Sequence, residues 1–155
     1  MKGFTLLELM VIMTITLIVG TASFLSFPAF RSRNTLRLSG DELRGQLRDA
    51  QFRAISQDSS SKWGVHFEGV PNGNDWYAVF SGDTYAGGAV QTKSSLPSNL
   101  KFIDPAEGAS KDVIFEKLTG VTAATAANIS LIDNTQVFYA ININANGLIS
   151  YAKSF

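Results

Sequence analysis

The longest apolar run of the chain begins almost at its first residue. Residues 4–27, FTLLELMVIMTITLIVGTASFLSF, contain a single charged residue, Glu8. A helix of this length extends about 36 Å at roughly 1.5 Å per residue, and a bilayer core is about 30 Å thick. The run therefore predicts a membrane-length helix that carries one carboxylate near its N-terminal end.

Glu8 is the feature of this run that needs an explanation. An acidic residue at the centre of a transmembrane helix costs about 2.5–3.5 kcal/mol, and intramembrane carboxylates usually have a partner. Two simpler interpretations stay open: Glu8 is solvated in the headgroup zone, or the run is a secretory signal peptide cut after Ala22. The signal peptide is disfavoured because its apolar stretch has only about 7–15 residues.

The first nine residues, MKGFTLLEL, resemble the class III signal of type IV pilins and type II secretion pseudopilins. This resemblance implies that a prepilin peptidase cuts between Gly3 and Phe4 and that the new Phe4 amine is N-methylated. It also implies that the Glu8 carboxylate of an incoming subunit meets the Phe4 amine of a neighbour in a filament. Such a pair offsets the cost of burying two charges and aligns the subunits.

An amphipathic helix is predicted over residues 28–57. Pro28 lacks a backbone donor, so we expect a bend or break of the helix at residues 26–28. Beyond it, apolar residues recur at spacings of four, three and four, which is typical of one helical face packed on a sheet. These residues are Leu43, Leu47, Ala50 and Ala54.

Two glycines interrupt this predicted helix. Gly40 and Gly45 each weaken a helix by about 1 kcal/mol relative to alanine, and we expect a discontinuity at residues 39–40. If a helix begins there, Asp41 and Glu42 lie in its first turn, where the positive end of the helix dipole favours acidic side chains.

The same stretch is rich in arginine. It contains six arginines and three acidic residues. The whole chain, in contrast, has a net charge of zero with 13 basic and 13 acidic residues. The arginines are Arg31, Arg33, Arg37, Arg44, Arg48 and Arg53. They could form an anion-binding surface for DNA, as in some minor pilins of competence systems, which the chain resembles. The favoured interpretation is a solvated face, with Asp41 paired to Arg44 and Asp49 to Arg53.

Residues 58–155 are predicted to form an antiparallel β head. Trp63, Val65 and Phe67 alternate with polar or small residues, and a second run over 75–81 completes a hairpin. Further strands are expected at 99–104, 112–117, 128–132, 136–143 and 148–152, with loops at 82–95 and 119–127. The fold class is therefore α+β, with a long N-terminal helix packed on an antiparallel sheet. The order of elements resembles the heads of H-type pseudopilins and related minor pilins.

Residue types in the head argue against catalysis and against a cofactor or metal. The chain has no cysteine and one histidine, His66, which is interpreted as a satisfied strand residue rather than a base. The acids of the head are interpreted as turn residues, since none follows a calcium-loop spacing: Asp75, Asp83, Asp104, Glu107 and Asp112. Residues 82–88 are glycine-rich but lack the Lys-Ser or Lys-Thr of a phosphate loop, and are read as a flexible surface loop. The tyrosines and tryptophans are assigned to packing.

The sequence thus predicts a pilin-like, minor structural subunit of a type IV pilus or type II secretion pseudopilus, and not an enzyme. The expected organisation is a leader at 1–3, a transmembrane and assembly helix at 4–27, an amphipathic helix at 28–57 and the head at 58–155. Expected partners are a prepilin peptidase, other pilin or pseudopilin subunits, and membrane lipid before assembly. We expect the chain to span the bacterial inner membrane once, with its head outside the cytoplasm, and then to enter the filament. The alternative function is a membrane-anchored module that captures DNA or an exported substrate.

Overall fold

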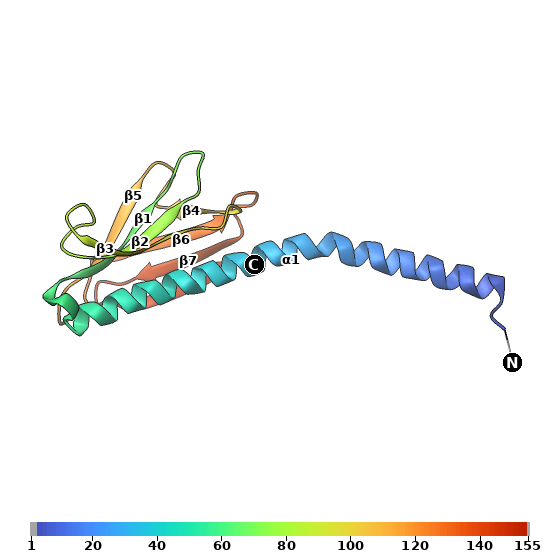
Figure 1. Cartoon of the computed structure of the whole chain (residues 1–155), viewed down its shortest axis with the longest axis horizontal. Coiled ribbons are helices and arrows are strands. Elements are labelled where there is room, and N and C mark those ends of the chain that lie inside the picture. The colour runs from blue at the N-terminus through green and yellow to red at the C-terminus, as the bar shows by residue number, and fades with distance from the viewer. Residues whose placement is uncertain (1–2, 155) are drawn as a thin grey trace. The chain divides into compact units, whose positions relative to one another are not determined.

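The computed structural model describes residues 3–154, and of residues 22–26 it describes only the backbone. One helix, α1 (Leu6–Ile55), is followed by a short 3-10 helix, η1 (Asp58–Ser60), and by strands (Figure 1). The chain divides into two compact units, Met1–Ser32 and Arg33–Phe155, which are considered separately below.

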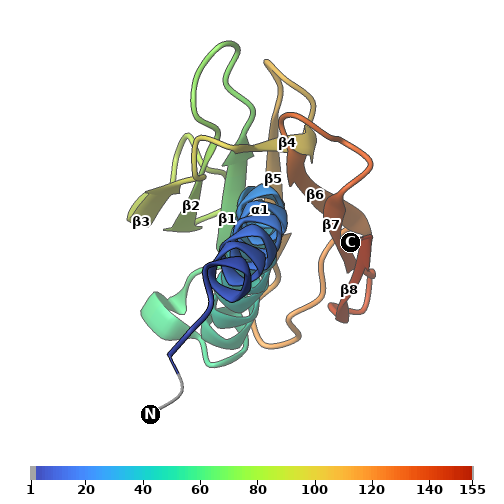
Figure 2. The ribbon, with the colours of Figure 1, turned by 90° about the vertical axis from the view of Figure 1, so that its right-hand side faces the viewer.

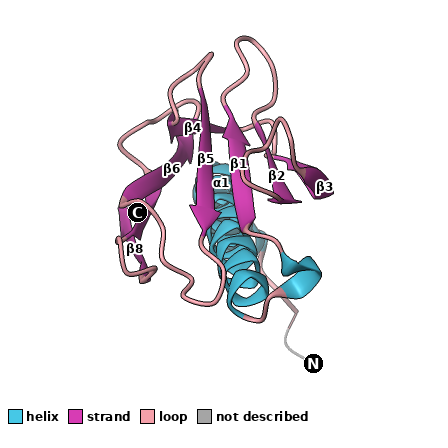
Figure 3. Cartoon of the chain, turned by 90° about the vertical axis from the view of Figure 1, so that its left-hand side faces the viewer, coloured by secondary structure: helices cyan, strands magenta, loops and turns pink. Residues whose placement is uncertain are grey.

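The second unit contains two four-stranded antiparallel sheets rather than one. Sheet A has the strand order β3-β2-β1-β5, and sheet B has the order β4-β6-β7-β8. Figures 2 and 3 show the two sheets from opposite ends of the chain, lying around the α1 segment of this unit. The strands are β1 (Trp63–Glu68), β2 (Trp76–Ser81), β3 (Ala89–Ser95), β4 (Leu100–Asp104), β5 (Ser110–Phe115), β6 (Thr125–Leu131), β7 (Phe138–Ile143) and β8 (Ile149–Ser154).

A single hydrophobic core joins both sheets to α1. The predicted helical stripe is confirmed, and Leu36 extends it by two turns. The stripe packs against inward residues of both sheets, among them Trp63, Phe67, Phe115 and Ile141. Each fully buried leucine or phenylalanine of this core contributes about 1.5–3 kcal/mol relative to an exposed one.

The predicted discontinuity at residues 39–40 is wrong, and the helix has no break at residues 26–28. The helix continues through Pro28 and through Gly40 without a break. At Gly40 the reason is packing: a Cβ there would lie 2.4 Å from Cγ of Tyr139. Gly40 is therefore a point where strand β7 approaches the helix closely, and the burial around it outweighs the low helix propensity of glycine.

Asp41 and Glu42 also have a different role from the predicted one. Since α1 begins at Leu6, neither residue lies in a first turn. The Tyr139 hydroxyl donates to Asp41 Oδ1 at 2.8 Å, and the Tyr77 hydroxyl donates to Glu42 Oε1 at 2.7 Å. These two adjacent acids tie the helix to sheet B and to sheet A respectively.

The sheets contain one strand more than predicted. Both predicted hairpins are confirmed, because β1 pairs with β2 and β7 pairs with β8. Strand β3 lies in the stretch 82–95 that was predicted to be a loop, and its residues are mostly exposed. An edge strand of this kind has no alternating apolar pattern to reveal it. Strand β6 likewise begins at Thr125, inside the predicted connection 119–127.

Candidate functional site

The N-terminal end of α1 has a side-chain cap. Thr5 precedes the first helical residue, and its Oγ1 accepts the backbone N–H of Glu8 at 3.2 Å. This places Thr5 at the N-cap of α1, where its side chain caps the backbone N–H of Glu8 three positions later. Gly3 and Phe4 lie before the helix, and Phe4 is 76% exposed. The peptide bond between them is therefore in non-helical backbone, with nothing packed on Gly3.

Large apolar side chains are exposed on every side of this first segment. The exposed set from residue 4 to residue 19 includes Phe4, Leu6, Leu7, Leu9, Met10, Val11, Ile12, Met13, Ile15, Leu17, Ile18 and Val19. The hydroxyls of Thr14, Thr16 and Thr21 donate to carbonyl oxygens three or four residues earlier, at 2.7–3.1 Å. Because these hydroxyls are already bonded within the helix, they do not make its surface strongly polar.

Among the described residues, no helix combines the length and the apolarity that a membrane crossing requires. The predicted run also includes residues 22–26, whose side chains lie outside the described part of the chain.

Three of the six arginines are engaged in contacts within the head. Arg53 pairs with Asp49 at 2.8 Å, as predicted, and its guanidinium also lies 4.8 Å from the centre of the Trp63 ring. The predicted Asp41–Arg44 pair is wrong: Asp41 lies 3.9 Å from Arg37. Arg44 instead lies over the Tyr151 ring, at 4.6 Å from its centre. Arg44 and Arg53 therefore link the helix to strands β8 and β1, whereas the Arg37 contact lies within the helix. All three arginines are less available to an anionic partner.

His66 is a buried, satisfied residue of β1, as predicted. Its Nδ1 lies 2.5 Å from Asp112 Oδ1 and its Nε2 lies 3.1 Å from Glu68 Oε2. Asp112 is directly opposite His66 in the register of β5 against β1, so a contact between residues far apart in sequence could be found only once the strand pairing is known. The Tyr85 ring stacks on His66 with centres 3.9 Å apart.

The stack on His66 corrects the reading of residues 82–88 as a flexible surface loop. Tyr85 also donates its backbone N–H to Asp112 Oδ2 at 3.2 Å, and it contacts the Phe80 ring edge-on. Gly88 lies against Phe80 as well, since a Cβ there would be 2.9 Å from that ring. The loop is thus folded back onto the outer face of sheet A and fixed there.

The other candidate acids form pairs or turn contacts. Asp83 pairs with Lys62 at 3.4 Å, and Asp104 pairs with Lys111. Within residues 3–154, no group of three or more His, Cys, Asp or Glu side chains is placed to hold a metal ion.

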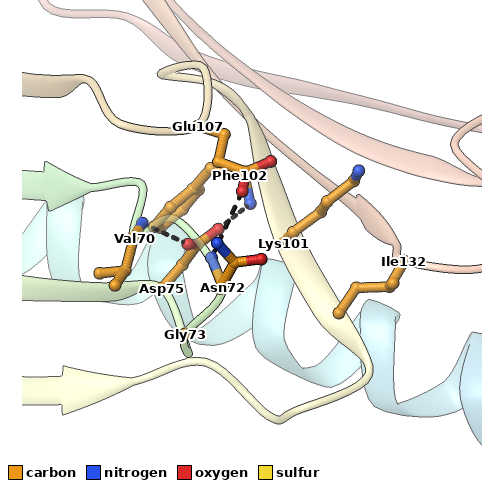
Figure 4. A pocket seen from close by; sticks show the side chains of 8 residues that line it. All are labelled: Val70, Asn72, Gly73, Asp75, Lys101, Phe102, Glu107 and Ile132. Atoms are coloured by element: carbon orange, nitrogen blue, oxygen red, sulfur yellow. Dashed lines mark hydrogen bonds between the residues drawn. The ribbon is translucent and has the colours of Figure 1, made fainter.

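One pocket of the head combines a buried acid with apolar side chains. It has a volume of about 250 Å³ and is bounded by the β1–β2 turn, strand β4 and the loops that follow β4 and β6 (Figure 4). Asp75 in this pocket is only 5% exposed. It accepts the backbone N–H groups of Val70 at 2.8 Å and Phe102 at 2.6 Å. No local sequence pattern predicts this pocket, because its walls come from four separate stretches of the chain.

Comparisons with known proteins agree with the first segment and with the fold. Residues 1–24 match the model of the prokaryotic N-terminal methylation motif. No curated protein sequence matches the chain significantly.

Two crystal forms of the type IV minor pilin FimU of Pseudomonas aeruginosa PAO1 have a similar structure. The first is 17% identical in sequence with a TM-score of 0.57, and the match covers 79% of this chain and 92% of FimU. The second is 16% identical with a TM-score of 0.54, over 76% of this chain and 92% of FimU. At these identities the likeness defines the fold. The chain thus carries an N-terminal methylation motif and has an α+β fold similar to that of FimU.

Proposed function

We propose that this chain is a minor structural subunit of a type IV pilus or pseudopilus, processed between Gly3 and Phe4 and methylated on the Phe4 amine. The observation that carries the proposal is the exposed apolar surface of residues 4–19, which lies within the methylation motif matched over residues 1–24. Before assembly this surface is covered by lipid of the bacterial inner membrane, with the head outside the cytoplasm. After assembly it is covered by the equivalent helices of neighbouring subunits.

Glu8 aligns the subunits in this proposal. Its backbone N–H donates a hydrogen bond to Thr5 Oγ1. Its carboxylate, in contrast, has no ion-pair or hydrogen-bond partner among the described residues. A carboxylate that enters an apolar bundle without a partner is costly. The methylated Phe4 amine of a neighbouring subunit is the cation that removes this cost, and the pair fixes the axial register.

Both a pilus and a secretion pseudopilus are consistent with the shared N-terminal motif. The likeness to FimU, described as a type IV minor pilin, favours the pilus. The same family resemblance supports a structural rather than an enzymatic role.

The test is the replacement of Glu8 by glutamine, which keeps the side-chain shape and removes the charge. In cells that carry the assembly machinery, we expect Glu8→Gln to reach the membrane normally and to lose at least about tenfold in incorporation into sheared filaments. This loss follows because breaking a buried ion pair costs about 3–5 kcal/mol. Asp83→Asn is the control, since that side chain is 84% exposed in the head. Normal incorporation of Glu8→Gln contradicts the proposed contact.

The alternative is a membrane-anchored module that captures DNA or an exported substrate. Arg31, Arg33 and Arg48 are exposed and supply the remaining positive surface of the helix. A gel shift of DNA by the full chain that weakens steeply with salt supports this alternative. The absence of a shift, or one insensitive to salt, excludes its DNA version.

A further inference from the structure

The pocket of the head contains a buried negative charge without a positive partner. Within residues 3–154, Asp75 lies within ion-pair distance of no lysine, arginine or histidine. Its two hydrogen bonds come from neutral backbone groups. An ionised carboxylate has about four acceptor positions, so Asp75 keeps further capacity to accept.

A second carboxylate stands at the rim of the same pocket. Glu107, from the loop between β4 and β5, accepts the backbone N–H of Asn72 at 3.4 Å and is exposed. Lys101 also contributes to the lining, but it pairs with no carboxylate in the described part of the chain. Figure 4 shows the Lys101 amine directed away from Asp75. The charges of the lining therefore sum to about minus one, with both carboxylates at one end.

The remaining walls are apolar. Val70, Phe102 and Ile132 line the pocket beside the acids. Phe102 is buried, whereas Ile132 is 47% exposed. A ligand that fits this arrangement has an aliphatic stem for the apolar wall and a cation at its end for the carboxylates. The side chains of lysine and arginine have this design.

We propose that this pocket binds the side chain of a lysine or arginine presented by a partner polypeptide. The ammonium or guanidinium group sits between Asp75 and Glu107, and its stem lies along Phe102 and Ile132. Lys101 weakens the binding of any such cation, because its like charge stands at the same opening. This inference concerns the head alone and does not depend on the processing or assembly of the N-terminal segment.

The experiment is a titration of the full chain in uncharged detergent micelles, followed by NMR at the backbone amides of Val70 and Phe102. The probe is Nα-acetyl-lysine methylamide, and its control is the norleucine equivalent, which has the stem without the charge. We expect a saturable shift with the lysine probe only. Salt should reduce it, since screening weakens ion pairs that reach the surface.

Two single substitutions test the charges of the lining. Glu107→Gln should weaken binding by roughly two- to fivefold, the range of a partly exposed ion pair, and Lys101→Met should strengthen it by a similar factor. Asp83→Asn removes the same charge from a distant loop and should leave binding unchanged. Asp75 itself is not replaced, because its two backbone contacts hold the pocket together.

Two results overturn the proposal. Equal binding of the norleucine derivative shows that only the apolar wall matters, and equal effects of Glu107→Gln and Asp83→Asn show that no local ion pair forms. None of these results bears on Glu8, so this proposal and the proposed function can fail independently.

Discussion

Helix α1 contains two stretches that differ in the exposure of their large apolar side chains: those of the first are exposed, whereas the second has a buried stripe. In residues 4–19 the large apolar side chains are exposed, from 47% at Val11 to 79% at Leu6. In residues 33–55 a single stripe of apolar side chains is buried, and each of them is about 1% exposed or less. Polar residues occupy most of the other faces. The first stretch has no core of its own to enter, whereas the second is part of the core of the head.

This difference predicts that substitutions in the two stretches of the helix have different effects. Apolar residues of the second stretch stabilise the fold of this chain, and their loss should lower its free energy of unfolding. Apolar residues of the first stretch are exposed in this chain and are proposed to contact lipid or other subunits, so their loss should leave the stability of the head unchanged. The following predictions test this division.

The largest expected effect comes from shortening one leucine in each stretch. Leu47→Ala should lower the free energy of unfolding by about 2–5 kcal/mol, because it leaves a cavity at a fully buried position. Leu17→Ala should change it by less than about 0.5 kcal/mol, since that side chain is exposed. Chemical denaturation followed by tryptophan fluorescence measures both. A similar loss in the two variants would remove the distinction between the stretches.

The two glycines of the second stretch should respond with opposite sign. Gly40→Ala should cost about 1–3 kcal/mol, because the new Cβ meets the Tyr139 ring at its rigid end. The Tyr139 ring is also held in place, since Tyr151 stacks on it with centres 5.5 Å apart. Gly45→Ala meets nothing within 4 Å and should stabilise the helix by about 0.5–1 kcal/mol. Thermal unfolding of the two variants decides this, and a stabilising Gly40→Ala contradicts the close packing.

The tyrosine contacts of the helix should make the head sensitive to alkaline pH. Burial, the hydrogen bond to Asp41 and the charge of Asp41 raise the pKa of Tyr139 to about 12. Burial and the bond to Glu42 also raise the pKa of Tyr77. Because the ordinary pKa of tyrosine is about 10, this stabilisation is complete below pH 10 and is lost as the pH rises through about 12.

Tyr139→Phe isolates one of these contacts. The variant should lose about 0.5–2 kcal/mol at neutral pH, since Asp41 gives up a hydrogen bond, and its stability should fall less steeply above about pH 10. Unfolding free energies measured from neutral to alkaline pH test this. An identical pH dependence of the two proteins would show that Tyr139 does not titrate differently in the folded state.

The smallest effect is expected at the cap of the first stretch. Thr5→Ala removes the acceptor for the Glu8 N–H and should destabilise the first turn by about 1 kcal/mol. Amide exchange at Glu8 should accelerate, while denaturation of the head stays the same. Thr5→Ser keeps the hydroxyl and serves as the control. Unchanged exchange in Thr5→Ala would mean that the cap is absent in solution.

The sequence was informative where one local pattern decides a structure. The helix predicted within residues 4–27, the stripe through Leu47 and the two hairpins rest on apolarity or periodicity, and the fold contains all of them. The N-cap at Thr5 is a local signal as well, because a threonine directly before an apolar run is typical of a helix start.

Sequence failed where partners are distant along the chain. Helix propensity predicts a break at Gly40. The Tyr139 ring that this glycine accommodates is 99 residues away and forms no part of the local pattern. Strand β3 is exposed and is held by its pairing with β2, so it leaves no apolar pattern. The pocket and the His66–Asp112 contact likewise depend on strand register, which single-residue propensities do not contain.

The measurement that tests the central claim most directly is the mass of the N-terminal peptide of the protein isolated from cells with a prepilin peptidase. The account predicts a chain that begins at Phe4 and carries one methyl group on its amine. A chain that still begins at Met1, or one that has been cut after Ala22, would contradict it.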